Sequence, residues 1–298
     1  MGDIVFKKEI ISSTHINFLF GAGVNGKALP QLKDFKETLT RIQNLGGDIS
    51  LGLESGIDSL ENNTAREQVK EVFKTEFKRF HEEALASWDR NSSINNVLSL
   101  LRKVHSIVNE TQNRNPDMKQ INIFSLNYDE IVENALRKLG YFYNSISASE
   151  TATKASLMDV IGYDYKVGKY IPSFMVSKIH GDIRKPIVPG KEKYIDMLNA
   201  DYFEIVFNMK EQLCKPNSIL IVIGYSGRDD HINKIIQDCL NAGLTIFWFK
   251  FSDTDNPPFS SIESQIKVKE QEDYKKPVDT TKLCYEDLEK AWEEKSEE

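Results

Sequence analysis

The stretch INFLFGAGVNG, residues 16–26, carries the first evidence for the fold. Ile16–Phe20 is a short, mostly apolar run with β-branched and aromatic residues that ends at Gly21, which is typical of a buried strand. The glycines that follow have the pattern G-x-G-x-x-G, which lets a backbone turn sharply and approach a pyrophosphate closely. Alone, this pattern also fits an ordinary strand-to-helix turn.

Four more runs of this kind lie further along the chain. They are Ile121–Leu126, Phe174–Ile179, Ile219–Ile223 and Leu244–Phe249. Apolar runs without polar alternation suit parallel strands that are covered on both faces. Apolar residues at helical spacing lie between the runs, so strands and helices alternate. This order predicts an α/β fold with a Rossmann-like parallel sheet.

Three segments depart from simple alternation. Residues 33–115 are almost wholly helical in pattern, and we expect a large helical insertion or cap over the ligand-binding edge of the sheet. Residues 140–173 are typical of loop and hairpin. Residues 261–298 are predicted to be a charged C-terminal extension of a catalytic domain at 1–260, with a frayed acidic end. A short amphipathic helix in the extension would carry Leu283, Leu288, Ala291 and Trp292 on its apolar side.

Composition excludes several classes of protein. The net charge of -7 disfavours a protein that mainly grips the nucleic-acid backbone, because that task needs a concentrated basic surface. The three cysteines form no C-x-x-C pair, so we expect neither a disulfide framework nor a metal site. No apolar run reaches the roughly 18 residues of a membrane span, and the N-terminus lacks the apolar core of a signal peptide. These features predict a cytoplasmic protein.

Polar residues follow three of the later strands, where ligands bind in open α/β sheets. Asn127 and Asp129 stand in SLNYD, and Asp129 is equally open to a role as a helix cap. His180 stands in KIHGD and is a candidate base, since its ordinary pKa is near neutral. Asp182 either orients this imidazole or is simply solvated.

The last of these strings is GYSGRDD, residues 224–230, after the most apolar strand. Ser226 could donate to a ribose hydroxyl or a phosphate. Arg228 could face a phosphate, or it could form an exposed ion pair with Asp229 or Asp230. A dehydrogenase would need a second strand soon after the first glycines, ending in an acidic residue ~20 residues on. The helical pattern at that position counts against that class.

The order G-A-G, N-x-D, H-G and G-x-S resembles the SIR2-like superfamily, over residues 14–255. SLNYD and GYSGRD are similar to the bacterial SIR2-like NAD⁺ hydrolases of anti-phage defence systems. The chain departs from protein-deacylating sirtuins because it lacks their zinc-ribbon cysteines and has Ser-Leu before Asn127 where they have Thr-Gln. Their Pro-Asp-Phe-Arg string after the glycines is not intact either.

The resemblance implies cleavage of the nicotinamide–ribose bond, with NAD⁺ as substrate and no metal or other cofactor. It implies that Asn127 positions the ribose or the water, that His180 is the base, and that Asp129 holds the ribose. The residues implied to bind the rest of the dinucleotide are Gly21, Ala22, Gly23, Asn25, Gly224, Ser226 and Arg228. A protein deacylase and a non-enzymatic sensor of NAD or ADP-ribose remain the alternatives, and a flavin or thiamine-diphosphate protein has no support from His180.

We expect regulation in trans, because unchecked NAD⁺ hydrolysis is toxic and the catalytic domain uses nearly the whole chain. The activator would be a homo-oligomer or a regulatory subunit in a prokaryotic cytoplasm. Similar proteins pair with HerA-type ATPases, short Argonautes or nucleotide-pyrophosphatase-like subunits. Residues 33–115 and the acidic C-terminus are the candidate interfaces, unless they are ordinary solvated surface.

Overall fold

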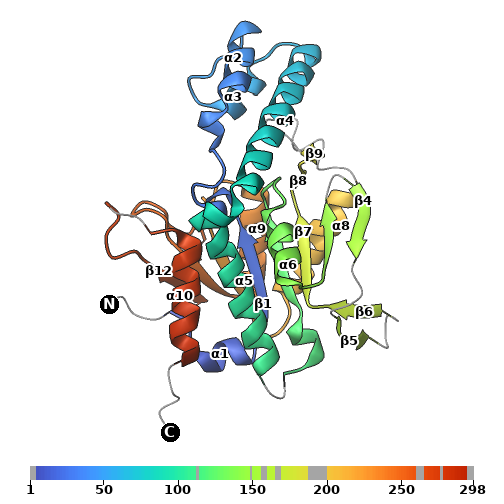
Figure 1. Ribbon diagram of the computed structural model, residues 1–298, viewed down its shortest axis with the longest axis vertical. Helices are drawn as coiled ribbons and strands as arrows, with labels where there is room; N and C mark the ends of the chain where they lie inside the picture. Colours follow the sequence, from blue (N-terminus) through green and yellow to red (C-terminus); the bar gives the residue numbers. More distant parts are fainter. Residues whose placement is uncertain are drawn as a thin grey trace.

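A largely parallel sheet with helices on both faces forms the centre of the molecule (Figure 1). The computed structural model describes residues 5–111, 114–147, 150–155, 160–164, 169–186, 200–259, 265–275 and 278–293. The eight-stranded sheet has the order β12-β11-β10-β1-β2-β7-β3-β4. Neighbouring strands are parallel from β12 to β3, and β4 is antiparallel to β3. The predicted α/β, Rossmann-like fold is confirmed.

The described elements have the following bounds. The strands of the main sheet are β1 (His15–Phe20), β2 (Ile121–Ser125), β3 (Tyr143–Ser147), β4 (Glu150–Ala155), β7 (Phe174–Lys178), β10 (Ser218–Ile223), β11 (Thr245–Phe249) and β12 (Ile266–Lys269). Two hairpins pair β5 (Val160–Asp164) with β6 (Lys169–Pro172) and β8 (Gly181–Asp182) with β9 (Lys185–Pro186). The α-helices are α1 (Lys8–Ser12), α2 (Lys36–Asn44), α3 (Leu53–Asp58), α4 (Asn63–Ala86), α5 (Ser92–Glu110), α6 (Ile131–Leu139), α8 (Ala200–Leu213), α9 (Asp230–Asn241) and α10 (Thr280–Glu293).

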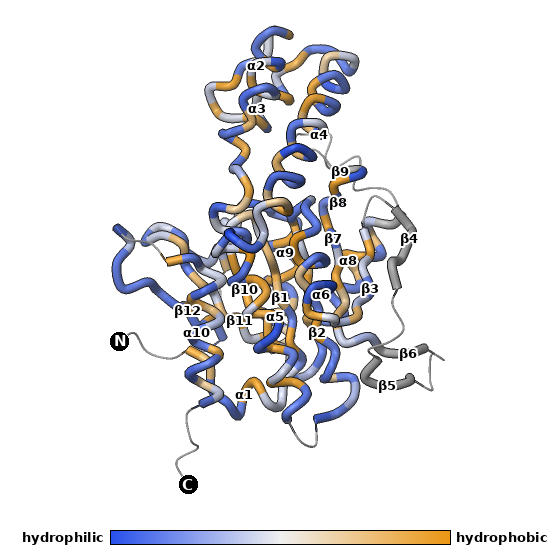
Figure 2. The backbone as a smooth tube through the Cα atoms, viewed as in Figure 1, coloured by the Kyte–Doolittle hydropathy of each residue, from blue (hydrophilic) through white to orange (hydrophobic). Residues whose placement is uncertain are grey.

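The five strands predicted from apolar runs are all present, as β1, β2, β7, β10 and β11. Successive residues of a strand point to opposite faces, and both faces of this sheet are covered. Phe18 and Phe20 pack in one core with α5, α6 and α10, while Leu19 packs in a second core with α8 and α9. The tube in Figure 2 shows the resulting hydrophobic strands between more mixed helices. Covering on both faces explains why these runs lack polar alternation.

Helices α2, α3 and α4 form an arm that projects from one end of the sheet domain (Figure 1). The arm has its own apolar core, in which Phe35 and Phe73 stack with ring centroids 5.1 Å apart. The prediction of one insertion over residues 33–115 is therefore only partly right. Helix α5 belongs to the sheet domain, because its buried residues pack in the same core as β1 and β2. Its apolar stripe has the same helical spacing as that of α4, so periodicity alone could not separate them.

Residues 140–173 were predicted as loop and hairpin, and that prediction is incomplete. The segment does contain antiparallel pairs, β3 with β4 and β5 with β6. However, β3 also pairs in parallel with β7 and extends the main sheet. Tyr143–Ser147 is polar and partly exposed, so it lacks the apolar run by which the other strands were found.

The C-terminal segment packs into the sheet domain. Strand β12 pairs with β11. The predicted amphipathic helix is present as α10, and its apolar side packs in the same core as α5. The buried carboxylate of Asp287 accepts the backbone N–H groups of Val5 and Phe6 and pairs with Lys269 at 2.7 Å. One carboxylate thus joins the N-terminus, β12 and α10. The acidic end predicted after Glu293 lies outside the described residues.

None of the helices in the described ranges has the length and apolar character to cross a membrane. The 24 residues of α4 and the 19 of α5 are long enough, but each helix carries charged residues along its exposed side. Both helices bury a single apolar stripe, which is the pattern of helices that pack on a protein core.

We expect Leu288→Ala to lower the free energy of unfolding by about 2–5 kcal/mol, because it opens a cavity where α10 packs on the core. The matched control is Lys290→Ala on the exposed side of the same helix, with a change within about 0.5 kcal/mol. Urea unfolding of the full chain measures both. Equal, small effects would show that α10 is a solvated appendage.

Candidate functional site

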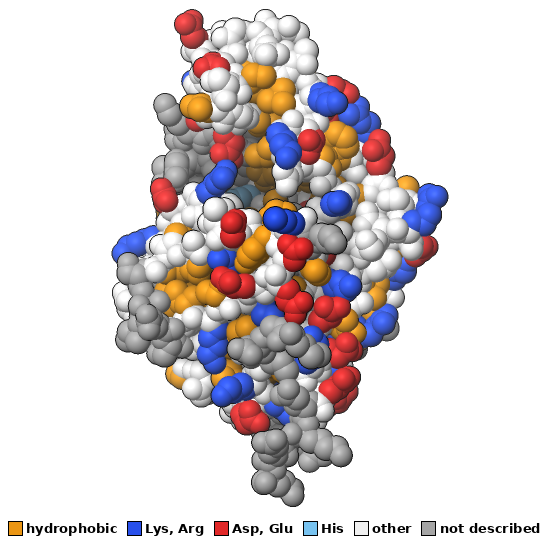
Figure 3. Space-filling view, turned by 90° about the vertical axis from the view of Figure 1, so that its left-hand side faces the viewer, with side chains coloured by type: hydrophobic (Ala, Val, Ile, Leu, Met, Phe, Trp, Pro, Cys, Tyr) orange, Lys and Arg blue, Asp and Glu red, His pale blue; other side chains and the backbone are white. Residues whose placement is uncertain are grey.

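The predicted site residues lie at the carboxyl ends of four adjacent strands, β10, β1, β2 and β7. Because these strands are parallel, the loops that follow them open at the same edge of the sheet. The arm stands over this edge, since Tyr128 and Ile183 pack against the arm's core. Figure 3 shows the surface hollowed between the arm and the body of the molecule. Segments distant in sequence are therefore brought to one place.

The loops after β1 and β10 touch through glycine backbone. A Cβ on Gly21 would lie 2.4 Å from the carbonyl oxygen of Gly224, and one on Gly224 would lie 2.3 Å from the backbone nitrogen of Val24. Gly224 also has a φ of 66°, which favours glycine. The N–H of Gly23 donates to the carbonyl of Gly224 at 3.0 Å. Side chains at Gly21 or Gly224 would force the two loops apart.

Asn127 joins the loop after β2 to the glycine loop. Its Nδ2 donates to the carbonyl of Gly21 at 3.0 Å. Its backbone N–H donates to Oγ of Ser125 at 3.2 Å, which holds the turn at the end of β2. Among the described residues, no hydrogen bond to the amide oxygen of Asn127 is found, so this oxygen can accept from a hydroxyl or a water.

Asp129 and Asn25 form a second link between the same two loops. Nδ2 of Asn25 donates to Oδ2 of Asp129 at 2.7 Å, and both residues are buried. The other carboxylate oxygen accepts the N–H of Ile131 at 3.0 Å, so Asp129 also caps the start of α6. The buried Oδ1 of Asn25 has no hydrogen-bond partner among the described residues. It is a buried acceptor in the loop after β1.

His180 lies at the end of β7 with a carboxylate beside it. Its Nε2 is 3.7 Å from Oδ1 of Asp229, which precedes α9. His180 is 5% exposed, and the side chain of Asp229 is 22% exposed, so the pair lies at a partly covered surface. Asp182, a candidate from the sequence to orient this imidazole, accepts the backbone N–H and the side chain of Arg184 within its own turn. The structure thus places Asp229 beside the candidate base.

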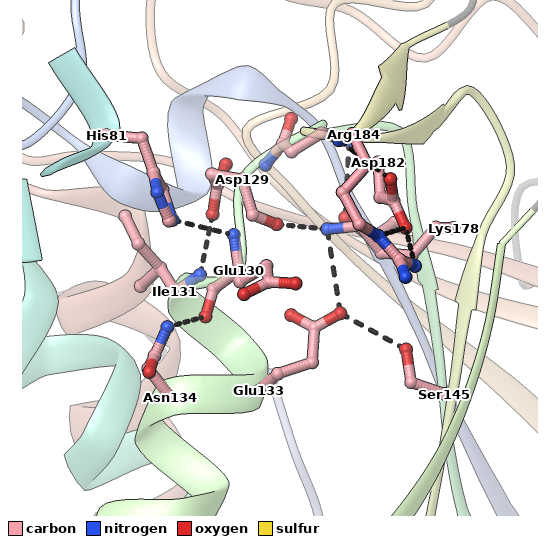
Figure 4. A network of polar contacts seen from close by, with 12 residues as sticks. His81, Asp129, Glu130, Ile131, Glu133, Asn134, Ser145, Lys178, Asp182 and Arg184 are labelled. Carbon is pink, nitrogen blue, oxygen red and sulfur yellow. Dashed lines mark hydrogen bonds and ion pairs between the residues drawn. The ribbon is translucent and has the colours of Figure 1, made fainter. Parts of the chain in front are cut away.

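A buried lysine holds the loop after β2 in place (Figure 4). Nζ of Lys178 donates to the backbone carbonyl of Asp129 and lies 3.8 Å from Oε1 of Glu133, which also accepts from Oγ of Ser145 at 3.2 Å. The side chains of Lys178 and Glu133 are 2% and 6% exposed. Burial raises the pKa of Glu133, and the charge of Lys178 opposes that rise.

The arm is attached to the same loop at two points. The ring of Tyr128, between the two site residues of this loop, meets Phe73 and Phe77 edge-on at centroid distances of 6.0 and 5.7 Å. Nε2 of His81, on α4, accepts the backbone N–H of Glu130 at 3.1 Å (Figure 4). Burial lowers the pKa of His81, which favours the neutral ring that this hydrogen bond requires.

The loop after β10 presents Ser226 and Arg228 to solvent. In the described part of the chain, Arg228 forms no ion pair with Asp229 or Asp230, so its guanidinium is available to an anionic ligand. The loop itself is rigidly held. Asn233 accepts from the hydroxyl of Tyr225 at 2.8 Å and donates to the carbonyl of Gly227 at 2.7 Å. Arg228 is therefore an exposed cation on a loop that hydrogen bonds hold in place.

The fold and this edge define a Rossmann-like α/β protein whose candidate site gathers loops from four strands. The family model described as a SIR2-like domain matches residues 121–274, slightly more than half of the chain. The chain belongs to this family. The match includes Asn127, His180 and Ser226, while the glycine loop after β1 lies outside it. SIR2-like domains are generally enzymes that use NAD, so the family indicates NAD-related activity. The search of curated proteins found no match for the chain.

Four residues of this site were not assigned from the sequence. Asp229 could be seen as one of two adjacent acids after a strand, but nothing along the chain pairs it with His180. Lys178 is a charged residue at the end of an otherwise apolar run, which hints at a buried partner. His81 and Tyr128 contact residues 49 or more positions away along the chain, so local pattern carries no sign of their roles.

We expect Lys178→Met to lower the free energy of unfolding by about 3–5 kcal/mol at about pH 8, because it leaves Glu133 buried without its cation. A carboxyl whose folded pKa is raised stabilises the folded state when protonated and loses that contribution as pH rises through the folded pKa. The deficit relative to the wild type should therefore shrink at about pH 5.

Urea unfolding at the two pH values measures this difference. The control is the double variant with Lys178→Met and Glu133→Gln, which removes both charges and should recover much of the loss. A deficit of Lys178→Met that is the same at both pH values would contradict the buried ion pair.

Proposed function

We propose that the chain hydrolyses NAD⁺ to nicotinamide and ADP-ribose. The observation that carries this proposal is that Asn127 meets the glycine loop and His180 meets Asp229 at the same carboxyl edge of a SIR2-like sheet. An amide, a base with its carboxylate and an exposed cation are the groups that such a reaction needs.

In the proposed reaction, the bond between C1′ of the ribose and the nicotinamide nitrogen breaks, and its electron pair leaves with neutral nicotinamide. Positive charge builds on the sugar, and water adds its oxygen to C1′. His180 takes the proton that the water loses, and Asp229 at 3.7 Å stabilises the imidazolium that forms. The proton then passes to solvent. Asn127, held by its Nδ2 on Gly21, positions the ribose or the water with its amide oxygen.

Asp129 has a supporting part in this proposal. Both of its carboxylate oxygens already accept protein N–H groups, one from Asn25 and one from the start of α6. Each carboxylate oxygen has a second lone pair, so the direct contact between Asp129 and the ribose that the resemblance implies stays a prediction. Asp129 also holds Asn25, whose buried Oδ1 has no partner among the described residues.

The diphosphate is proposed to lie beside the two touching glycine loops, over Ala22 and Gly23. The N–H groups of Gly21, Gly23 and Val24 already donate to backbone carbonyls. The glycine loop therefore contributes few hydrogen-bond donors to a diphosphate. Its contribution is that the diphosphate can approach the backbone closely at Ala22 and Gly23. Positive charge for the diphosphate then comes from Arg228, and Ser226 is exposed beside it to donate to the adenosine half.

We expect His180→Ala and Asn127→Ala each to lower NAD⁺ turnover by about 10²-fold or more, since positioned acid–base groups supply about that factor. Asp229→Asn should lower turnover by about tenfold or more, because it removes the charge beside the base. The matched control is Asp230→Asn, an exposed neighbour. Nicotinamide release from NAD⁺ measures all four variants, with folding checked by urea unfolding.

Near-normal turnover in both His180→Ala and Asn127→Ala would refute this assignment. Nicotinamide release that depends on an added acyl-lysine peptide would favour a deacylase. Stoichiometric NAD⁺ binding without release, in the presence of every co-purified protein, would favour a sensor.

We further propose that the arm regulates the reaction. A partner subunit or further copies of the chain would act on it. Such control is what an effector of an anti-phage system would require. Tyr128 sits between Asn127 and Asp129 and is packed into the arm's core, while His81 holds the next residue. A protein that shifts the arm would thereby shift the loop that positions the substrate. Activity per molecule should rise with protein concentration or with a co-purified partner, and full activity of a dilute monomer would contradict regulation in trans.

We expect Phe73→Ala to lower NAD⁺ turnover several-fold more than Phe35→Ala. Both substitutions remove a buried phenylalanine ring from the arm's core, and Phe73 is the one whose ring meets Tyr128. The comparison uses nicotinamide release by the two purified variants. Equal effects would show that the arm acts on the site through stability alone.

A further inference from the structure

Three potential metal ligands lie together at the end of β7 and the start of α9. One donor atom from each of His180, Asp229 and His231 lies within 4.8 Å of the other two. Nε2 of His180 is 3.7 Å from Oδ1 of Asp229, and the two imidazole rings have centroids 5.7 Å apart. The ligands come from the end of β7 and the start of α9, which are distant in sequence, so neither motif alone reveals the cluster.

The donor set matches a borderline transition metal. Two imidazoles and one carboxylate suit zinc, whereas magnesium and calcium prefer oxygen ligands alone. Zinc bonds of ~2.0–2.2 Å in a tetrahedral arrangement place donor atoms ~3.4 Å apart. The separation of 3.7 Å between His180 and Asp229 is already close to that value. Three protein ligands leave the fourth position to water.

The surroundings allow reversible binding. Nε2 of His180 and both ring nitrogens of His231 are buried, whereas the side chain of Asp229 is 22% exposed, so an ion would approach from the side of this carboxylate. Tyr202 of α8 packs beside His231 with ring centroids 6.1 Å apart, which limits where that imidazole can turn. The partial positive charge at the start of α9 opposes a cation, and the carboxylate of Asp229 offsets it. These features predict weaker binding than in a closed four-ligand site.

We propose that His180, Asp229 and His231 form an inhibitory site for Zn²⁺. The reaction proposed above uses no metal, and the inhibition, though not the binding, rests on that proposed function. A zinc ion on Nε2 holds the lone pair with which His180 would accept the proton of water. Binding of zinc and catalysis by His180 therefore exclude each other.

Zn²⁺ binding by the purified full chain tests the site without any need for activity. Competition with a chromophoric zinc chelator should show that the wild type binds zinc and that affinity falls by about tenfold or more in His180→Asn and in His231→Asn. Loss of a residue that only supports a metal ligand already lowers affinity by about that factor. His105→Asn is the matched control, because His105 lies on α5 and stacks on Tyr141.

Cys214→Ala is a second control, because Cys214 lies beside Cys239 and thiols also bind zinc. Loss of binding in Cys214→Ala with retention in His231→Asn would overturn the proposal, as would zinc binding that neither histidine variant weakens.

Nicotinamide release tests the inhibition separately. Zinc should lower the turnover of the wild type, and His231→Asn should stay active and resist zinc. A rise in turnover on adding zinc, or equal inhibition of the wild type and His231→Asn, would overturn the inhibitory role. If no NAD⁺ hydrolysis is found under any condition, the proposed function fails while the binding result still decides whether the metal site exists.

Discussion

The backbone contact between Gly21 and Gly224 is the constraint on which the site depends. Neither residue has room for a Cβ, so the loops after β1 and β10 lie against each other. This contact places the carbonyl of Gly21 where Asn127 donates to it from the neighbouring strand. It also starts the loop that carries Asp229 back across the edge to His180. The glycines therefore set the positions of the two loops in the protein itself, before any diphosphate binds.

A second constraint is the buried charge beneath the loop after β2. Lys178 donates to the backbone of Asp129 and pairs with Glu133. Both side chains are buried, so either charge without the other would destabilise the fold. Above the same loop, Tyr128 and His81 attach it to the arm. The position of Asn127 thus depends on the sheet, on a buried ion pair and on the arm together. A loop with three such supports suits a reaction that needs its groups in place before substrate arrives.

Much of the fold could be predicted from the sequence, because its central strands are covered on both faces and therefore appear as unbroken apolar runs. Strand β3 could not be predicted, because it is polar and lacks such a run. The division between α4 and α5 could not be predicted either, because it depends on which hydrophobic core each helix packs against. In the site, the strings at strand ends predicted which loops converge. The partners within them, such as Asp229 for His180 and Asn25 for Asp129, are set by tertiary packing and have no local pattern.

The central claim is that these convergent residues surround the reacting bond of one dinucleotide. A crystal structure of the His180→Ala variant with NAD⁺ tests it most directly. The account predicts C1′ of the nicotinamide ribose between Asn127 and position 180, with the diphosphate beside Ala22, Gly23 and Arg228. A dinucleotide bound elsewhere, or one whose nicotinamide ribose lies away from Asn127, would contradict it.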